Sequence, residues 1–467
     1  MVVTDYREFI ARKNVRNNHV GFDVDDAAIN QRAFDWQRVI VKWALKTGRA
    51  ALLEECGLGK TLQQLLWSEH VVNHSGCRAL LLCPLVVQFQ TKAEANRFGI
   101  NVPVNICESQ ADVTDGITIA NYEKLHLFDA SHFRAVCLDE GSILKNFTGS
   151  TKRALCRDFR DTRYKLTCTA TPAPNDRMEI GNQAEFLGVM PSNEMLARWF
   201  VNDGSKVGSY RLKKHGERDF WRWMASWAVC ISSPSDIGFE CPGYDLPPLE
   251  MIEHVVKSPT PKGQLFANVA DSISAVDVHR EKRAALSERA DVVGELVTSD
   301  RDQWAVWCDT DYEADALLAR IPDAVEARGS QPIELKQERL RAFTEGQARV
   351  IITKPEIGGL GLNWQHCHKT TWFAGYSFER WYQAIRRLLR FGQEFPVECH
   401  VVRTEREGSI VEAVQEKERL HKEMQSEMAG MMREAMLSEL GLREELERYV
   451  TTQTLTLPNW ITKKGKR

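Results

Sequence analysis

Short apolar runs alternate with longer amphipathic stretches in the first part of the chain. The runs are four or five residues long, at residues 50–53, 79–83, 117–120, 135–138 and 164–167. Runs of this length with no polar alternation are typical of strands buried on both faces of a sheet. Residues 61–72 and similar stretches between the runs have helical spacing. The pattern therefore predicts an α/β fold with an open, mostly parallel sheet.

The alternation breaks and then resumes. Residues 196–231 are rich in aromatic and basic side chains, and residues 232–249 contain four prolines, which is typical of a linker. A second series of apolar runs follows at residues 305–308, 350–353, 371–374 and 398–402. From residue 411 to 449 the spacing predicts a Met-rich helix with a core-facing stripe, interrupted at Gly430 and Gly441.

We therefore predict two α/β units with a cleft between them. The predicted parts are an N-terminal segment (1–30), a first unit with an aromatic and basic helical insertion (31–231), a linker (232–249), a second unit (250–405) and a helical C-terminal extension with a basic tail (406–467).

Composition narrows the class of protein. The 467 residues carry 61 Lys and Arg against 64 Asp and Glu, a net charge of −3, so nucleic-acid binding would need a local basic surface. The 12 cysteines are scattered without a C-x-x-C pair, which favours free thiols in a reducing compartment over a zinc ribbon. There is neither an apolar run long enough for a membrane span nor an apolar N-terminus, so we expect a cytoplasmic protein.

The segment Gly57-Leu-Gly-Lys-Thr61 follows a predicted strand and begins a predicted helix. Gly57 and Gly59 allow backbone N–H groups to approach phosphates, Lys60 can reach the terminal phosphates, and the Thr61 hydroxyl can bind magnesium. The strict phosphate-loop pattern has a glycine where this chain has Glu54. The alternative is a plain turn that caps a helix.

An acidic pair, Asp139 and Glu140, ends the predicted strand at residues 135–138. Magnesium bound to a nucleotide needs a nearby carboxylate, and hydrolysis needs a base that orients the attacking water. Asp139 suits the first role and Glu140 the second. The alternative is a solvated turn at a strand end, which becomes the weaker interpretation downstream of a phosphate loop.

The second unit contains a basic segment at residues 383–393. Arg387 and Arg390 are three residues apart and would share a helix face. Guanidinium groups stabilise the charge on a transferring phosphoryl group, so these arginines are candidates to complete a hydrolytic site on closure of the cleft. The alternative is a solvated basic helix face.

In this order, the motifs resemble those of the superfamily 2 helicases, and within them the Swi/Snf-type DNA translocases. The resemblance covers roughly residues 30–405 and implies two RecA-like lobes that bind ATP and Mg²⁺. Its main segments are residues 54–61, 138–146, 167–172 (followed by Pro174 and Asn175), 358–363 and 383–393. Residues 167–172 are similar to the motif that couples the ATP site to the nucleic-acid groove.

The resemblance also implies roles for residues other than the phosphate loop, the acidic pair and the two arginines. Gln37 would contact adenine, Gly361 would contact the nucleotide, and Gln383 would be one of the catalytic residues. Pro84, Asn121 and Asn363 would contact the nucleic acid. One departure concerns the acidic motif, where Ser142 replaces the usual histidine, so coupling between hydrolysis and the nucleic acid is expected to differ. The length leaves no room for large insertions, and the chain resembles a compact prokaryotic or phage version.

The aromatic and basic stretch at residues 210–227 has two interpretations. Its tryptophans could stack on bases, but Trp223 and Trp227 are four residues apart and share a helix face, which favours ordinary packing. Lys213 and Lys214 are the better candidates for DNA contacts. His366 and its neighbour two residues on fit a surface strand end better than a metal site.

These observations predict an ATP- and Mg²⁺-dependent motor that acts on DNA. Translocation on double-stranded DNA is favoured over strand separation, because residues 358–363 and 383–393 look Swi/Snf-like. Two alternatives stay open: a helicase that acts on RNA, and a nucleotide-dependent assembly switch that does not hydrolyse ATP.

Overall fold

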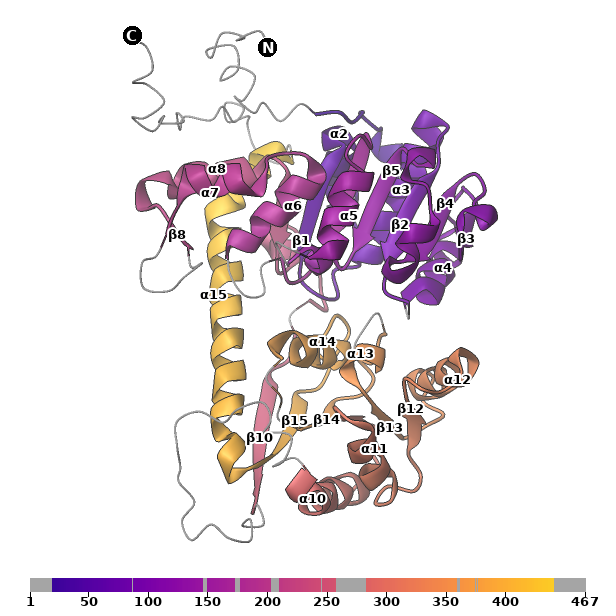
Figure 1. Ribbon diagram of the computed structural model, residues 1–467, viewed down its shortest axis with the longest axis vertical. Helices are drawn as coiled ribbons and strands as arrows, with labels where there is room; N and C mark the ends of the chain where they lie inside the picture. Colours follow the sequence, from indigo (N-terminus) through magenta and orange to yellow (C-terminus); the bar gives the residue numbers. More distant parts are fainter. Residues whose placement is uncertain are drawn as a thin grey trace, which may run out of the picture. The chain divides into compact units, whose positions relative to one another are not determined.

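The computed structural model describes residues 19–440, apart from 86, 146–148, 173–176, 203–209, 245, 258–282, 359–361, 374 and 376. The chain divides into two compact units: unit 1 comprises residues 1–240 and 424–467, and unit 2 comprises residues 241–423. The main sheet of each unit is parallel throughout and has helices packed on it (Figure 1). The predicted fold class, α/β with two RecA-like parallel-sheet lobes, is confirmed. The division at residues 240/241 falls inside the predicted linker.

The sheet of unit 1 has the strand order β3-β4-β2-β5-β6-β1-β9. Its strands are β1 (Arg49–Glu54), β2 (Ala79–Cys83), β3 (Val104–Ile106), β4 (Ile117–Asn121), β5 (Ala135–Asp139), β6 (Tyr164–Cys168) and β9 (Ala228–Ile231). The five predicted strands are all present, and β2, β4, β5 and β6 are buried along their whole length. Strands β3 and β9 were not predicted. The three residues of β3 are only half-buried at the sheet edge, and β9 falls in the stretch that was interpreted as a helical insertion.

Helices cover both faces of this sheet. They are α2 (Asp35–Thr47), α3 (Lys60–Ser75), α4 (Val87–Phe98), α5 (Ser150–Asp158), α6 (Ile180–Leu187), α7 (Ser192–Trp199) and α8 (Glu217–Ala225). Successive strand side chains point to opposite faces. Leu53, Val136 and Leu138 therefore share one core with residues of α5, α6, α7 and α8, while α2 and α3 contact the sheet through β1, β5 and β6.

The aromatic and basic stretch packs into this core, as its spacing predicts. Trp221, Trp223 and Trp227 are each at most 1% exposed, and the Trp223 ring stacks on Trp199 with 4.7 Å between centroids. An antiparallel pair, β7 (Phe200–Asn202) and β8 (Tyr210–Leu212), stands beside these helices. Because the indole rings are buried, they are not available to stack on bases.

Helix α15 (Gly408–Glu439) runs through Gly430, so the predicted interruption there is wrong. A glycine in a helix interior costs only about 1 kcal/mol. Met428 and Met432, on either side of Gly430, are fully buried in the core of unit 1, which more than offsets that cost. Met436 is also buried, in line with the predicted stripe. Gly441 and the basic tail lie outside the described residues.

The sheet of unit 2 has the order β10-β15-β14-β11-β13-β12. Its strands are β10 (Leu249–Val256), β11 (Trp304–Trp307), β12 (Val325–Ala327), β13 (Val350–Thr353), β14 (Lys369–Phe373) and β15 (Val397–Thr404). Strands β10 and β12 form the two edges and were not predicted. Most of β10 is exposed or half-buried, so it lacks the continuous apolar run that identifies the inner strands.

The helices of unit 2 are α10 (Leu286–Thr298), α11 (Asp311–Leu318), α12 (Ile333–Thr344), α13 (Pro355–Gly358) and α14 (Phe378–Leu388). Val293 of α10 and Leu317 of α11 pack against Val306 and Val350 in the main core of this unit. Over the described part of both units, we find no helix that combines the length and the apolar character needed to cross a bilayer.

Candidate nucleotide and nucleic-acid site

The predicted phosphate loop connects the end of β1 to the start of α3. Gly57 and Gly59 have φ values of 89° and 74°, in the left-handed region that favours glycine. A Cβ on Gly59 would lie 2.5 Å from Nε2 of Gln37, so the position is closed to larger residues as well. The loop thus adopts a conformation that depends on its two glycines.

Gln37, the predicted adenine contact, lies on α2 directly beside this loop. Its Nε2 donates to the carbonyl of Leu58 at 2.9 Å, and its Oε1 accepts the N–H of Phe34 at 3.1 Å. The side chain is 3% exposed. It therefore connects the beginning of α2 to the phosphate loop, and its contact with adenine stays a prediction.

Lys60 begins α3 and folds back onto the loop. Its Nζ donates to the carbonyls of Glu54 and Glu55 at 2.8 and 3.0 Å. Thr61 follows in the first helical turn and is partly exposed. An ammonium held by two neutral carbonyls can exchange them for phosphate oxygens, which form stronger, charge-assisted hydrogen bonds.

Asp139 ends β5 and contacts the first turns of α3. Its Oδ1 accepts a hydrogen bond from Nε2 of Gln64 at 2.7 Å, and its carbonyl accepts one from the Tyr122 hydroxyl at 2.5 Å. The side chain of Gln64 projects one helical turn after Lys60. The fold therefore brings Asp139 next to the phosphate loop, although the two are far apart in the sequence. The roles of Gln64 and Tyr122 were not predicted, and only the i+4 spacing from Lys60 could have indicated Gln64.

Glu140 is in the left-handed region, with φ of 56°, and no other non-glycine residue described in the structure has a positive φ. Such backbone strain persists where the surroundings impose it, often at functional sites. The next position is closed to a side chain: a Cβ on Gly141 would lie 2.1 Å from Oγ1 of Thr167. The backbone after Glu140 is therefore pressed against the predicted coupling motif.

Gln183 of α6 joins these two motifs. Its Nε2 donates to the carbonyl of Gly141 and its Oε1 accepts from the Thr167 hydroxyl, both at 2.7 Å. Gln183 is 1% exposed and was not predicted as a site residue. Ser142, where the resemblance has a histidine, is buried beside this link. Asn146, Pro174 and Asn175, at the ends of the two motifs, lie outside the described residues.

Glu54 takes the place of the glycine of the strict phosphate loop. Its carboxyl group is fully buried, and Oε2 accepts a hydrogen bond from Nε2 of Gln63 at 2.7 Å. Its Oε1 has no hydrogen-bond partner among the described residues. Burial raises the pKa of this carboxyl from 4.5 to about 7, against the opposing effects of the Lys60 ammonium and of Gln63.

The raised pKa of Glu54 predicts a pH-dependent contribution to stability. The folded state binds this proton more tightly than the unfolded state between pH 4.5 and about 7. The free energy of unfolding that Glu54 contributes should therefore decrease as pH rises through this window, by about 3 kcal/mol in all. Urea unfolding of the wild type and of Glu54→Gln across the window tests this. A difference between the two proteins that does not vary with pH would contradict it.

The arginines of unit 2 meet at one backbone carbonyl. Nη1 of Arg387 and Nη1 of Arg390 donate to the carbonyl of Leu362 at 3.2 and 3.1 Å. Nε of Arg387 also donates to the carbonyl of Gln383 at 3.1 Å. The prediction that both arginines share a helix face is wrong, because α14 ends at Leu388 and the chain turns there. The two side chains nevertheless converge on Leu362, within the segment at residues 358–363.

Other residues of the segments 358–363 and 383–393 differ in their surroundings from the two arginines. Oδ1 of Asn363 is buried without a hydrogen-bond partner among the described residues. Gln393 donates to the carbonyls of Cys367 and Leu388, so its side chain holds the turn after α14. Gly361, a predicted nucleotide contact, lies outside the described residues.

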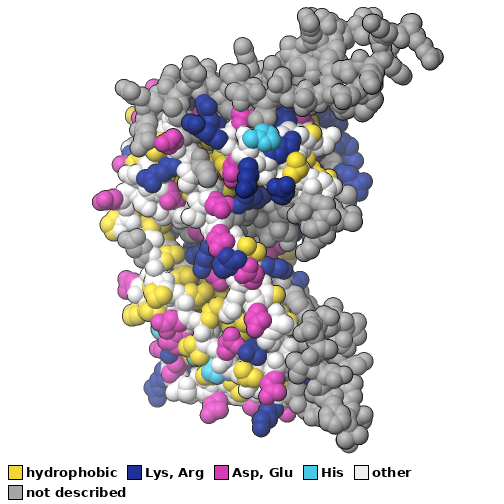
Figure 2. All heavy atoms as spheres, turned by 90° about the vertical axis from the view of Figure 1, so that its left-hand side faces the viewer, with side chains coloured by type: hydrophobic (Ala, Val, Ile, Leu, Met, Phe, Trp, Pro, Cys, Tyr) yellow, Lys and Arg dark blue, Asp and Glu magenta, His cyan; other side chains and the backbone are white. Residues whose placement is uncertain are grey.

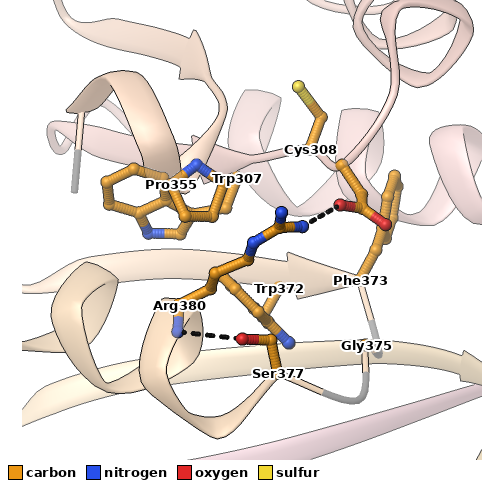
Figure 3. A pocket seen from close by; sticks show the side chains of 9 residues that line it. Trp307, Cys308, Pro355, Trp372, Phe373, Gly375, Ser377 and Arg380 are labelled. Atoms are coloured by element: carbon orange, nitrogen blue, oxygen red, sulfur yellow. Dashed lines mark hydrogen bonds and ion pairs between the residues drawn. The ribbon is translucent and has the colours of Figure 1, made fainter. Parts of the chain in front are cut away.

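A small cavity opens at the carboxyl ends of β11 and β14 (Figure 3). The rings of Trp307, Trp372 and Phe373 line it, and Arg380 crosses it to reach Asp309 at 3.3 Å. Its volume of about 50 Å³ has room for one or two water molecules and not for a nucleotide. We therefore do not assign it to ATP.

The predicted nucleic-acid contacts in unit 1 differ in exposure. Asn121 is 3% exposed, and its Oδ1 accepts the backbone N–H of Lys124. Pro84 is partly exposed. Nζ of Lys213 donates to the carbonyls at residues 197 and 198, so it caps the C-terminus of α7, whereas Lys214 is exposed. Lys214 is thus the more accessible of the two predicted lysines.

The part of the chain that the structure describes holds no group of three or more His, Cys, Asp or Glu side chains able to bind a metal ion. His366 faces the carbonyl of Phe343 at 3.2 Å. A magnesium ion at the phosphate loop would therefore depend on a few protein oxygens, on phosphates and on water, which is the coordination it prefers at nucleotides.

Comparison with known proteins bears on unit 1. No curated protein matches the chain. The model of one protein family, described as SNF2-related domain, matches residues 36–208. The matched segment contains the phosphate loop, the acidic pair and the coupling motif. Residues 36–208 are therefore similar to the SNF2-related domain, the ATPase type found in motors of helicase superfamily 2.

Proposed function

We propose that this protein is an ATP- and Mg²⁺-dependent motor that translocates on DNA, with duplex DNA as the favoured substrate. The observation that carries the proposal is the contact of Asp139 with Gln64 of α3, the helix that Lys60 begins; Glu140 follows Asp139 directly in the chain. A cation for phosphate, a carboxylate for magnesium and a carboxylate that orients the attacking water are the groups that phosphoryl transfer to water requires.

In this proposal ATP binds at the phosphate loop of unit 1. Lys60 exchanges the carbonyls of Glu54 and Glu55 for phosphate oxygens, and Gln37 contacts adenine. Thr61 and Asp139 would hold Mg²⁺, since their hard oxygen donors fit that ion. When bound, the ion would supply positive charge that stabilises the phosphates in the transition state.

Glu140 orients and deprotonates the attacking water in this mechanism. The hydrogen bonds from Gln183 to Gly141 and from Thr167 to Gln183 support a coupling role for residues 167–172, because a shift of the Glu140 backbone would be passed directly to Thr167. This link would serve where the resemblance has a histidine and this chain has Ser142.

Unit 2 contributes the groups that respond to nucleotide. Arg387 and Arg390 would leave the Leu362 carbonyl to stabilise the transferring phosphoryl group, with Gln383 and Gly361 at the nucleotide. Leu362 immediately precedes Asn363, a predicted nucleic-acid contact. Release of the Leu362 carbonyl would therefore allow the backbone next to Asn363 to move. Pro84 and Asn121 are the corresponding candidates in unit 1.

The test is the rate of phosphate release with Mg²⁺ and ATP, in the presence of duplex DNA, single-stranded DNA or RNA. We expect the strongest stimulation by duplex DNA, and none in Lys60→Ala. Strongest stimulation by RNA would indicate an RNA helicase. If the wild type released no more phosphate than Lys60→Ala under any condition, the motor proposal would fail and a nucleotide-dependent switch would replace it.

A further inference from the structure

Three exposed basic side chains lie within eight consecutive residues of unit 1, and one of them, Lys214, is already a predicted nucleic-acid contact. They are Arg211 of β8, Lys214 in the turn before α8, and Arg218 of α8; we call them the basic surface. All three are exposed, and none forms an ion pair with any residue that the structure describes. Many other exposed arginines are neutralised locally, as Arg341 is by Glu345 at 2.6 Å.

The acidic residues nearest in sequence do not cancel this charge. Glu217 is half-buried and forms no ion pair with Arg218 among the described residues. Asp219 is held toward the core, because its Oδ2 accepts the indole N–H of Trp199 at 3.0 Å. The basic surface therefore keeps a net positive charge.

The basic surface stands on closely packed aromatic side chains. Phe220 and Trp223 of α8 are at most 1% exposed and pack on Trp199 of α7, with the Phe220 and Trp199 rings 5.6 Å apart. Lys213 fastens the end of β8 to α7 through two hydrogen bonds. Charges on a fixed scaffold lose little conformational entropy of the backbone when they bind a partner.

The surroundings of the basic surface favour a polyanion over a folded protein. Protein interfaces rely on buried aromatic or aliphatic anchors at their centre. None of the exposed large hydrophobic side chains of the described chain lies between residues 192 and 226, and the tryptophans there are buried. Figure 2 faces the side of unit 1 with α7 and α8, and shows Lys and Arg side chains exposed on it. Such a surface can contact phosphates without reading bases.

The basic surface lies away from the predicted motif contacts. Helix α8 leads into β9 at one edge of the sheet, whereas Pro84 follows β2 and Asn121 ends β4, near the other edge. Five strand intervals separate β4 from β9, which is about 24 Å at the usual strand spacing. The basic surface would thus contact phosphates other than those that Pro84 and Asn121 would contact.

We propose that the basic surface binds the phosphate backbone of the nucleic acid on which this protein acts, without base specificity. The proposal rests on the proposed function, because it assigns a second contact to the same substrate. Bidentate guanidinium groups suit phosphate oxygens, and two of the three residues are arginines.

The experiment measures binding of labelled duplex DNA over a range of salt concentrations. The variant is Arg211→Gln/Lys214→Gln/Arg218→Gln. Its control is Arg134→Gln/Arg153→Gln/Arg160→Gln, which removes three exposed arginines of unit 1 that also have no ion-pair partner among the described residues. The plot of log affinity against log salt should become shallower by about 0.9 for each phosphate that the variant can no longer bind, and stay unchanged in the control. ATP hydrolysis without DNA should equal that of the wild type in both.

Equal salt dependence in the wild type and the variant would overturn the proposal. So would competition by polyglutamate as effective as that by duplex DNA at equal charge, which would indicate an acidic protein partner. If the triple variant does not fold, Arg218→Gln alone gives the same comparison with a smaller change. A wild type that binds DNA without releasing phosphate would refute the motor function and leave this proposal standing, so the two failures are distinguishable.

Discussion

Replacing Glu140 by glutamine should stop ATP hydrolysis while ATP binding persists. Glutamine keeps the size of the side chain and its hydrogen-bonding ability, but it cannot take a proton from water. The loss of a general base lowers turnover by about 10²–10⁴-fold. Lys60, Thr61 and Asp139 remain in place, so the dissociation constant for a nucleotide analogue should change little. Phosphate release and equilibrium binding of fluorescent ATP measure the two quantities.

The matched control is Glu123→Gln, which makes the same chemical change at an exposed position of unit 1. It should leave turnover at the wild-type level. Because Glu140 is a non-glycine residue at φ of 56°, Glu140→Gly should relieve backbone strain and raise the melting temperature while abolishing turnover. Normal hydrolysis by Glu140→Gln would refute the assignment of Glu140 as the base and return the acidic pair to the solvated-turn interpretation.

Replacing Arg387 should give the second large effect. An arginine that stabilises the transferring phosphoryl group contributes about 10³–10⁵-fold to turnover. Arg387→Ala should therefore reduce turnover by about 10³-fold or more. Arg387→Lys should also be strongly impaired, since an ammonium lacks the planar fork that binds two oxygens at once. ATP binding to unit 1 should stay near the wild-type value in both variants.

A structural role must be separated from this catalytic one, because Arg387 also donates to the carbonyls of Gln383 and Leu362. Arg390 still binds the Leu362 carbonyl when Arg387 is removed, so the fold of unit 2 should survive, and thermal unfolding checks this. Arg386→Gln on the same helix is the control; its guanidinium lies over the ring of Tyr382. Equal losses of turnover in Arg386→Gln and Arg387→Ala would show that the helix needs positive charge in general and not Arg387 in particular.

The strands that could be predicted from sequence are buried on both faces; β9 is buried too, but it was missed because it follows an aromatic and basic stretch interpreted as a helical insertion. Strands such as β2 and β5 have no exposed residue, and a continuous apolar run follows directly from that burial. Edge strands β3, β10 and β12 are only partly buried. Their polar residues interrupt the apolar run by which a strand is recognised in the sequence. The predicted interruption at Gly430 is wrong because helix propensity is a local property. The burial of Met428 and Met432 depends instead on contacts with residues that are far away in the sequence.

The candidate chemistry could be identified from local sequence: a phosphate loop at Gly57 to Thr61, an acidic pair and an arginine segment each occupy a few consecutive residues. How these groups are held depends on the fold. Hydrogen bonds join residues that are far apart in the sequence: Gln64 binds Asp139, and Gln183 binds both Gly141 and Thr167. The net charge of −3 likewise gave no indication of the basic surface. A hydrogen bond or an unpaired charge depends on which atoms meet in space, and local patterns of residues do not contain that information.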